Sequence, residues 1–92
     1  STPEINLKVP EEDKFKIIDG LKTSIDSSVY KLIDIDGIRL ENKNSWGLVR
    51  ASNTSPNLVL RFEGKTESDL LEIKNYFKEL LSKIEIDLKL DF

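Results

Sequence analysis

Five consecutive residues near the middle of the chain, Arg50-Ala51-Ser52-Asn53-Thr54, combine the donor groups that bind an anion. The arginine guanidinium is a planar fork of N–H groups that can bind a phosphate through two hydrogen bonds. Ser52 and Thr54 add hydroxyl donors, and Asn53 adds an amide. Backbone N–H groups in a tight turn can also form an anion-binding nest. The residue types therefore suit a phosphate site.

The same residue types are also common in ordinary loops. Ser, Asn, Thr and Pro occur in turns because their side chains or rings favour local turn conformations. An arginine at the end of a strand is often simply solvated. From residue types alone, two interpretations stay open: a phosphate site, and a plain connection between two strands.

Other polar and aromatic residues near this loop have simpler interpretations. Arg61 and Glu63 lie two residues apart, on one face of the strand expected after the loop. A surface ion pair, which contributes about 0–1 kcal/mol, is the simpler reading. The functional interpretation is that Arg61 is a supporting residue, a second positive group near the anion site. Trp46 is expected in the core or as a brace for the loop rather than as a stacking platform.

Composition excludes several kinds of site. The 92 residues include no Cys and no His, which removes the thiolate, the commonest general base and the commonest metal ligand. The net charge of −3 gives no reason to expect binding to nucleic acid or to an anionic membrane. No apolar run could span a membrane and no signal peptide is recognisable, which suits the cytoplasm. We predict no catalytic residue, no metal site and no cofactor in this chain.

Apolar periodicity predicts the elements that position the loop. Strands are expected near 5–9, 29–34, 38–40, 46–50 and 58–63, helices at 11–24 and 67–83, and an edge strand or packed extension at 86–90. The first helix should bury a stripe made of Phe15, Ile18, Leu21 and Ile25, and Thr66 or Ser68 can cap the second. Asp36-Gly37 is a turn signal. This order predicts an α+β domain: an antiparallel sheet with both helices packed on one face.

The region around the loop resembles a known family. Residues 46–56, WGLVRASNTSP, and their continuation 57–63, NLVLRFE, resemble the C-terminal domain of the α-D-phosphohexomutases, nearest the bacterial phosphomannomutase/phosphoglucomutase branch. The resemblance covers essentially all of residues 1–92, as one domain. Asn53 and Ser55 favour this branch, because phosphoglucosamine mutases typically carry Gly and Glu there. A start without Met, at Ser1-Thr2-Pro3, suggests a fragment of a longer protein, although ordinary Met removal is the alternative.

The resemblance implies a fold and a role. The family's fourth domain has a TATA-binding-protein-like fold, closes the active site and clamps the phosphate that is not being transferred. By that analogy Arg50, Ser52, Asn53 and Thr54 are the phosphate contacts. The partners are a hexose phosphate, of mannose or glucose, and the other domains of the parent enzyme. Those domains supply a phosphoserine, Mg²⁺ and recognition of the sugar hydroxyls, so this chain alone is predicted to be inactive. The alternative is a non-catalytic α+β module that binds a partner through its sheet face.

Overall fold

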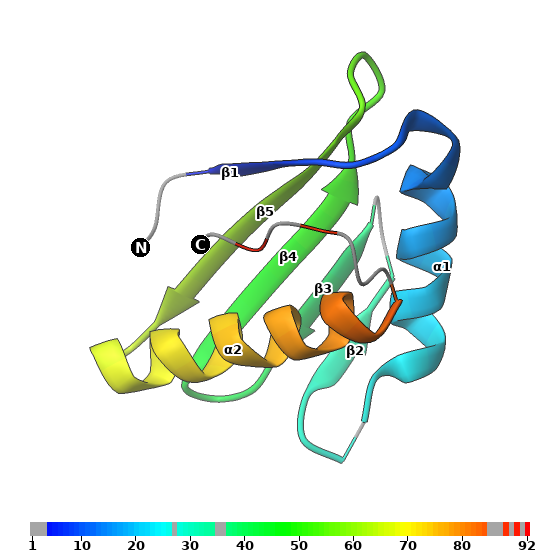
Figure 1. The fold of residues 1–92 in the computed structure, drawn as a ribbon. Coiled ribbons are helices and arrows are strands. Elements are labelled where there is room, and N and C mark those ends of the chain that lie inside the picture. Colours follow the sequence, from blue (N-terminus) through cyan, green and yellow to red (C-terminus); the bar gives the residue numbers. More distant parts are fainter. Residues whose placement is uncertain (1–3, 27, 35–36, 85–87, 89, 91) are drawn as a thin grey trace.

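The structure, a computed structural model, describes residues 4–26, 28–34, 37–84, 88, 90 and 92. Its elements follow one another in the order β1 (Ile5–Lys8), the 3₁₀ helix η1 (Glu11–Asp13), α1 (Lys14–Ser24), β2 (Lys31–Ile33), β3 (Ile38–Glu41), β4 (Ser45–Ala51), β5 (Asn57–Gly64) and α2 (Glu67–Ile84). Figure 1 shows α2 crossing the strands and α1 standing beside them. The predicted order of helices and strands is confirmed.

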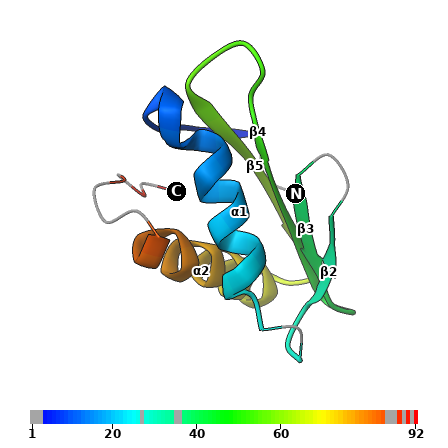
Figure 2. The same cartoon turned by 90° about the vertical axis from the view of Figure 1, so that its right-hand side faces the viewer.

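The five strands form one antiparallel sheet in the order β1-β5-β4-β3-β2. Strands β2 to β5 are neighbours in both sequence and space, so they form a meander. β1 adds to the outer edge of β5, with Ile5 opposite Leu60. Both helices lie on the same side of the sheet, as Figure 2 shows, and the predicted α+β class is confirmed.

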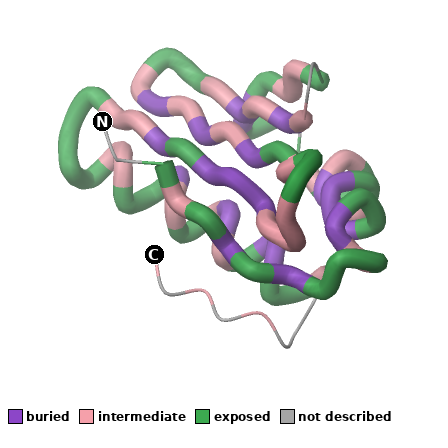
Figure 3. Tube along the Cα trace, turned by 90° about the horizontal axis from the view of Figure 1, so that it is seen from above, coloured by how far each residue is buried: buried purple, intermediate pink, exposed green. Residues whose placement is uncertain are grey.

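The two faces of the sheet differ because side chains alternate along a strand. In β5, Leu58, Leu60 and Phe62 point toward the helices and are almost completely buried. Figure 3 shows buried positions alternating with half-buried ones along the strands. The largest buried side chains in the core are Tyr30, Phe62, Phe77, Ile17, Leu21, Ile38, Leu40, Leu58, Leu60, Ile73 and Leu81. The opposite face carries no helix.

Helix α1 differs from the prediction at both its start and its buried face. Residues 11–13 form η1 rather than the first turn of one continuous α-helix. Phe15 was expected in the core but is 61% exposed, whereas its neighbour Lys14 is 2% exposed. Ile18 and Leu21 are buried as predicted, and Ile25 packs against the core from a half-buried position. The helix therefore turns Lys14, Ile18 and Leu21 toward the sheet and leaves Phe15 in solvent.

Helix α2 agrees closely with its prediction. Thr66 caps it: the backbone N–H of Asp69 donates to Thr66 Oγ1 at 3.1 Å, and Thr66 Oγ1 donates to Asp69 Oδ2 at 3.0 Å. Leu88 and Leu90 are half-buried against the core, as a packed extension would be, whereas Ile86 lies outside the described residues. None of the described helices is both long and apolar enough to cross a membrane.

Candidate functional site

The loop predicted to bind phosphate lies at the tip of the β4–β5 hairpin. Ile38, the first residue of β3, pairs with Val49, so Arg50 and Ala51 continue β4 beyond the end of β3. Residues 52–56 therefore project past the rest of the sheet, as the loop at the top of Figures 1 and 2 shows. The register of β3 on β4 thus places Arg50 at the point where β4 extends beyond β3.

Backbone hydrogen bonds give this loop a defined shape. The N–H of Ser52 donates to the Asn57 carbonyl at 2.9 Å and closes the end of the ladder. The N–H of Asn57 donates to the Ser55 carbonyl at 2.8 Å, which makes a three-residue turn around Pro56. The fixed φ of proline suits the centre of such a turn. The sequence therefore dictates the path of the second half of the loop.

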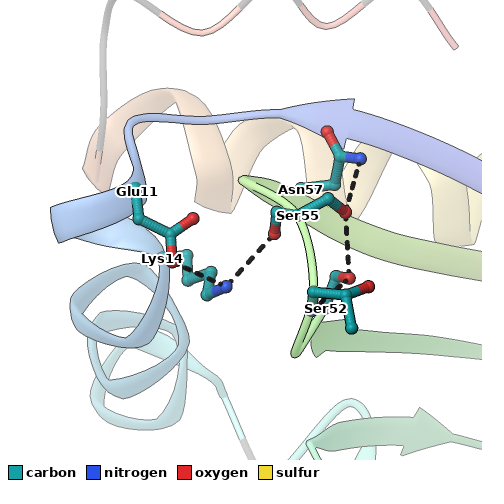
Figure 4. Close-up of polar contacts among 6 residues, drawn as sticks. Glu11, Lys14, Ser52, Ser55 and Asn57 are labelled. Carbon is teal, nitrogen blue, oxygen red and sulfur yellow. Dashed lines mark hydrogen bonds and ion pairs between the residues drawn. The ribbon is translucent and has the colours of Figure 1, made fainter.

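A chain of side-chain contacts runs along the inside of the loop (Figure 4). Asn57 Nδ2 donates to Ser55 Oγ at 3.1 Å, and Ser55 Oγ lies 3.0 Å from Ser52 Oγ. Because Ser55 already accepts a hydrogen from Asn57, its own proton is well placed to be donated to Ser52. The Thr54 N–H also points at Ser52 Oγ, at 3.4 Å. In this arrangement Ser52 accepts within the loop and keeps its own O–H for a ligand.

Two residues of the chain's first quarter attach the loop to the body of the domain. The N–H of Val9 donates to the Pro56 carbonyl at 2.9 Å. Lys14 Nζ donates to the Ser55 carbonyl at 3.1 Å and pairs with Glu11 Oε1 at 3.0 Å (Figure 4). Both attachments hold the second half of the loop, so the first half, with Asn53 and Thr54, faces outward.

A cavity of about 530 Å³ lies beside the hairpin tip and is lined by Phe15, Ile18, Gly37, Arg50, Ala51 and Asn53. Arg50, Ala51 and Asn53 line it on the hairpin side, and Phe15 and Ile18 of α1 form an apolar wall. Within the described part of the chain, the Arg50 guanidinium and the Asn53 amide make no hydrogen bond or ion pair.

The structure brings most of the predicted site residues together. Arg50 and Asn53 line the cavity, half-buried Ser52 lies within the loop and exposed Thr54 lies at its tip. Arg61 is separate: it lies on β5 opposite Leu48, on the sheet face without helices. It is a diagonal neighbour of Arg50, because Arg50 pairs with Val59, two residues before Arg61. At this spacing, about 7–8 Å between backbones, long side chains can still approach one another.

Two side chains missed as site residues in the sequence were Lys14 and Phe15. Phe15 fits the apolar stripe of the helix and so is expected in the core, whereas the residue type of Lys14 does not indicate burial, because lysine is rarely buried. The acidic first turn, Glu11 to Asp13, offered a weak signal, because it supplies a partner that allows a lysine to be buried. The contact with Ser55 spans 41 residues and has no local signal.

Trp46 lies outside the core and away from the loop. It is half-buried on the sheet face without helices, and the Arg39 guanidinium stacks 4.4 Å from the centre of its ring. Arg39 Nε also pairs with Glu41 Oε2 at 3.2 Å. The expectation of a core residue or loop brace was wrong, since β4 alternation turns Trp46 to the same face as Glu41. Among the described ion pairs, none joins Arg61 to Glu63.

Comparison with known proteins agrees with the fold and loop sequence. Residues 4–80 match the sequence profile of the family described as "Phosphoglucomutase/phosphomannomutase, C-terminal domain". A phosphomannomutase/phosphoglucomutase of Pseudomonas putida is 50% identical over 92 residues, which are 100% of this chain and 20% of the relative. A phosphoglucomutase of Neisseria meningitidis serogroup A is 42% identical over 83 residues, covering 88% of this chain and 18% of the relative.

A solved structure shows the same arrangement of elements. The crystal structure of a phosphoglucomutase/phosphomannomutase family protein from Burkholderia thailandensis superposes with a TM-score of 0.84 and 34% sequence identity. The match covers 99% of this chain and 19% of that protein. The chain thus spans about a fifth of the length of these relatives. It belongs to the phosphoglucomutase/phosphomannomutase family, as the C-terminal domain.

Proposed function

We propose that this domain holds the phosphate group of a hexose phosphate, of mannose or glucose, within a cytoplasmic phosphomannomutase/phosphoglucomutase. In that enzyme it clamps the phosphate that is not being transferred and closes the active site. The observation that carries the proposal is the asymmetry of the hairpin loop. One half is fixed through the carbonyls of Ser55 and Pro56, and the other places Arg50 and Asn53 at a cavity, where neither side chain has a polar partner among the described residues.

The chemistry of these donors suits a phosphate monoester. The Arg50 guanidinium can bind two phosphate oxygens at once, and charge-assisted bonds of this kind are stronger than neutral ones. The Ser52 and Thr54 hydroxyls and the Asn53 amide add donors around the same tip. Holding one end of the substrate fixes its distance and orientation relative to reacting groups elsewhere in the enzyme.

The other wall of the cavity suits a sugar ring without selecting its hydroxyls. Phe15 and Ile18 present carbon atoms beside Arg50, and the apolar face of a hexose can pack against such a surface. A contact of this kind tolerates a ring bound in either of two directions. A mutase needs this tolerance, because the 1-phosphate and the 6-phosphate of one intermediate must exchange places.

The reaction itself is assigned to other parts of the parent enzyme. The family resemblance implies Mg²⁺ and a phosphoserine there. The described residues of this chain contain no group of three or more Asp, Glu, His or Cys side chains that could hold a metal ion. These residues do not fit a Mg²⁺ site, so the proposal uses no metal step in this domain.

Titration of the 92-residue chain with inorganic phosphate tests the proposal. Three or four charge-assisted hydrogen bonds contribute roughly 1.5–3 kcal/mol each in favourable cases. Loss of translational and rotational freedom costs at least about 4 kcal/mol, and an open cavity leaves the ion partly hydrated. We expect a dissociation constant in the millimolar range or weaker. Amide chemical shifts should change at residues 50–54.

Two arginine variants make the test specific. Arg50→Ala should weaken phosphate binding at least about tenfold and leave the free energy of unfolding within ~0.5 kcal/mol, because its side chain is exposed. Arg61→Ala removes the same charge from the neighbouring strand and should weaken binding about threefold at most. Shifts that map to Trp46 and Arg39 instead would favour the alternative, a module that binds through its open sheet face. Equal effects of the two variants would argue against the loop as the clamp.

A further inference from the structure

Lys14 occupies a position that two physical effects oppose. It is the first residue of α1, where the helix dipole is unfavourable to a cation. Its side chain is 3% exposed, and a buried charge loses most of its hydration. Of the described charged side chains it is the one that is buried. Simple stability would favour an apolar residue of similar length at this place.

The contacts of Lys14 show what this charge does. Its ammonium pairs with Glu11 Oε1 at 3.0 Å, and the Glu11 side chain is 63% exposed, so the carboxylate keeps much of its hydration. The same ammonium donates to the Ser55 carbonyl at 3.1 Å. Glu11 therefore offsets the charge, and the remaining donor capacity is directed at the loop. The first turn of α1 and the β4–β5 hairpin are joined through this one atom (Figure 4).

The position of the Ser55 carbonyl affects several contacts within the loop. It also accepts the N–H of Asn57, and the Ser55 hydroxyl is part of the chain that leads to Ser52. A change in backbone ψ at Ser55 would turn its hydroxyl relative to the carbonyl that Lys14 holds, and so away from Ser52. Asn53, two residues earlier in the same loop, lines the cavity.

We propose that Lys14 is a positioning residue for phosphate binding: it holds the Ser55 carbonyl and thereby keeps the loop in its binding conformation. The inference rests on the proposed function. Lys14 does not touch the ligand; it reduces the conformational freedom that the loop would otherwise lose on binding. Because Glu11 neutralises it at close range, its long-range attraction for an anion is small.

A positioning role and a structural role predict different results for Lys14→Met. Lys14→Met removes the buried member of the ion pair and leaves Glu11, whose side chain is 63% exposed and stays hydrated, so no charge is left buried and unpaired. The variant should therefore unfold at the same urea concentration as the wild type or a higher one. Its affinity for inorganic phosphate should fall about tenfold, and amide hydrogen exchange at 52–57 should become faster. A residue with only a structural role would change stability and leave the affinity alone.

Lys65→Met is the matched control. Lys65 is exposed and follows β5, whose eight residues separate it from the loop by roughly 26 Å. It loses the same charge and should change phosphate affinity by less than about twofold. Glu11→Gln is the second variant; because it leaves the Lys14 ammonium buried without a charged partner, it should lower the free energy of unfolding, and amide NMR checks that it folds. It removes the charged partner but keeps the Lys14–Ser55 hydrogen bond, so phosphate should bind as well as to the wild type or better.

The outcomes separate this inference from the function on which it rests. If the wild-type chain shows no phosphate-dependent shifts at 50–54, the proposed function is wrong. If the wild type binds and Lys14→Met binds equally well, the clamp stands and the positioning role is wrong. Should Lys14→Met not fold, Glu11→Gln still decides: a tenfold loss of affinity in that variant would contradict a role that acts through Ser55.

Discussion

Ser55 links three neighbours through two different oxygen atoms. Its carbonyl accepts from Lys14 Nζ and from the Asn57 N–H, and its hydroxyl lies between Asn57 Nδ2 and Ser52 Oγ. Each successive bond in such a chain polarises the next. With Ser55 as the donor to Ser52, the Ser52 hydroxyl gains donor strength from residues that no ligand would touch.

Replacing Ser55 by alanine separates the two functions of this residue. Ser55→Ala keeps the carbonyl that Lys14 holds and removes the hydroxyl that orients Ser52. We expect phosphate affinity to fall about threefold, since one hydrogen bond contributes about 0.5–1.5 kcal/mol. Isothermal titration of both proteins with phosphate would measure this. Ser24→Ala, which removes an exposed hydroxyl bonded to the Gly20 carbonyl at 2.8 Å, is the control and should bind phosphate normally.

At the residue scale, the residue types indicate the outward half of the candidate site but not Lys14, which supports the loop. Arg50 and Asn53 could be chosen because their donor groups are visible in the residue types, and the structure places both at a cavity. Lys14 could not be chosen, since nothing in its neighbourhood predicts a contact with Ser55. Burial of a charge depends on packing between elements, which a residue type does not report.

At the scale of elements, the turn between β2 and β3 helps to shape the site. Gly37 has φ of 125°, a region that other residues rarely adopt. A Cβ there would lie 2.5 Å from the Val49 carbonyl oxygen and 2.8 Å from Arg50 Cβ. Gly37 thus lies directly against the end of β4, and a side chain there would displace the residue that carries the guanidinium.

Gly37→Ala should therefore affect stability and binding together. We expect a loss of about 2–3 kcal/mol in the free energy of unfolding, from the strained φ and the contact with β4. Phosphate affinity should fall as well, because Arg50 moves. Urea unfolding and phosphate titration would measure the two effects. Gly20→Ala makes the same change inside α1, where the nearest atom is Ile84 Cγ2 at 3.2 Å. There the gain of about 1 kcal/mol in helix propensity opposes the tight contact, so stability should change little.

The positions of helices and strands were easier to predict from sequence than the side of each helix that is buried. The alternation of Leu58, Leu60 and Phe62 defined β5 from sequence, and the Thr66 cap defined the start of α2. The buried face of α1 was misjudged at Phe15. A short helix beside the end of a sheet can bury any of several adjacent rows of side chains. The arrangement of the strands determines which row is buried.

At the scale of the whole molecule, Tyr30 joins elements that are far apart in the sequence. It is 2% exposed, and its ring lies 4.8 Å from that of Tyr76 on α2. Burial, with smaller contributions from Glu72 and Tyr76, raises the pKa of the Tyr30 phenol above its ordinary value. The folded protein therefore keeps this proton at a pH where the unfolded chain has lost it.

This shift predicts a loss of stability in alkaline solution. The unfolded phenol ionises near pH 10, so the contribution of Tyr30 is complete below that pH and declines as the pH rises above it. The difference in free energy of unfolding between wild type and Tyr30→Phe should become smaller or change sign between about pH 9 and pH 11. Urea titrations at a series of pH values would show this. A constant difference over that range would mean that the phenol ionises equally in both states.

The overall arrangement followed from sequence because local rules sufficed for it. Short connections between β2, β3, β4 and β5 require a meander, and two amphipathic helices can cover only one face of so small a sheet. The place of β1 beside β5 had no such basis. It depends on pairing between strands that are far apart in the sequence, with Ile5 opposite Leu60.

That pairing has a consequence for the order of folding. Strands β2 to β5 connect near neighbours and can assemble quickly, whereas the contact of Lys14 with Ser55 must close 41 residues of chain. The loop at the hairpin tip therefore reaches its final shape only when β1 and α1 dock, late on the pathway. An anion bound there stabilises the native state but not the transition state. Phosphate should slow unfolding in stopped-flow experiments while the refolding rate stays the same.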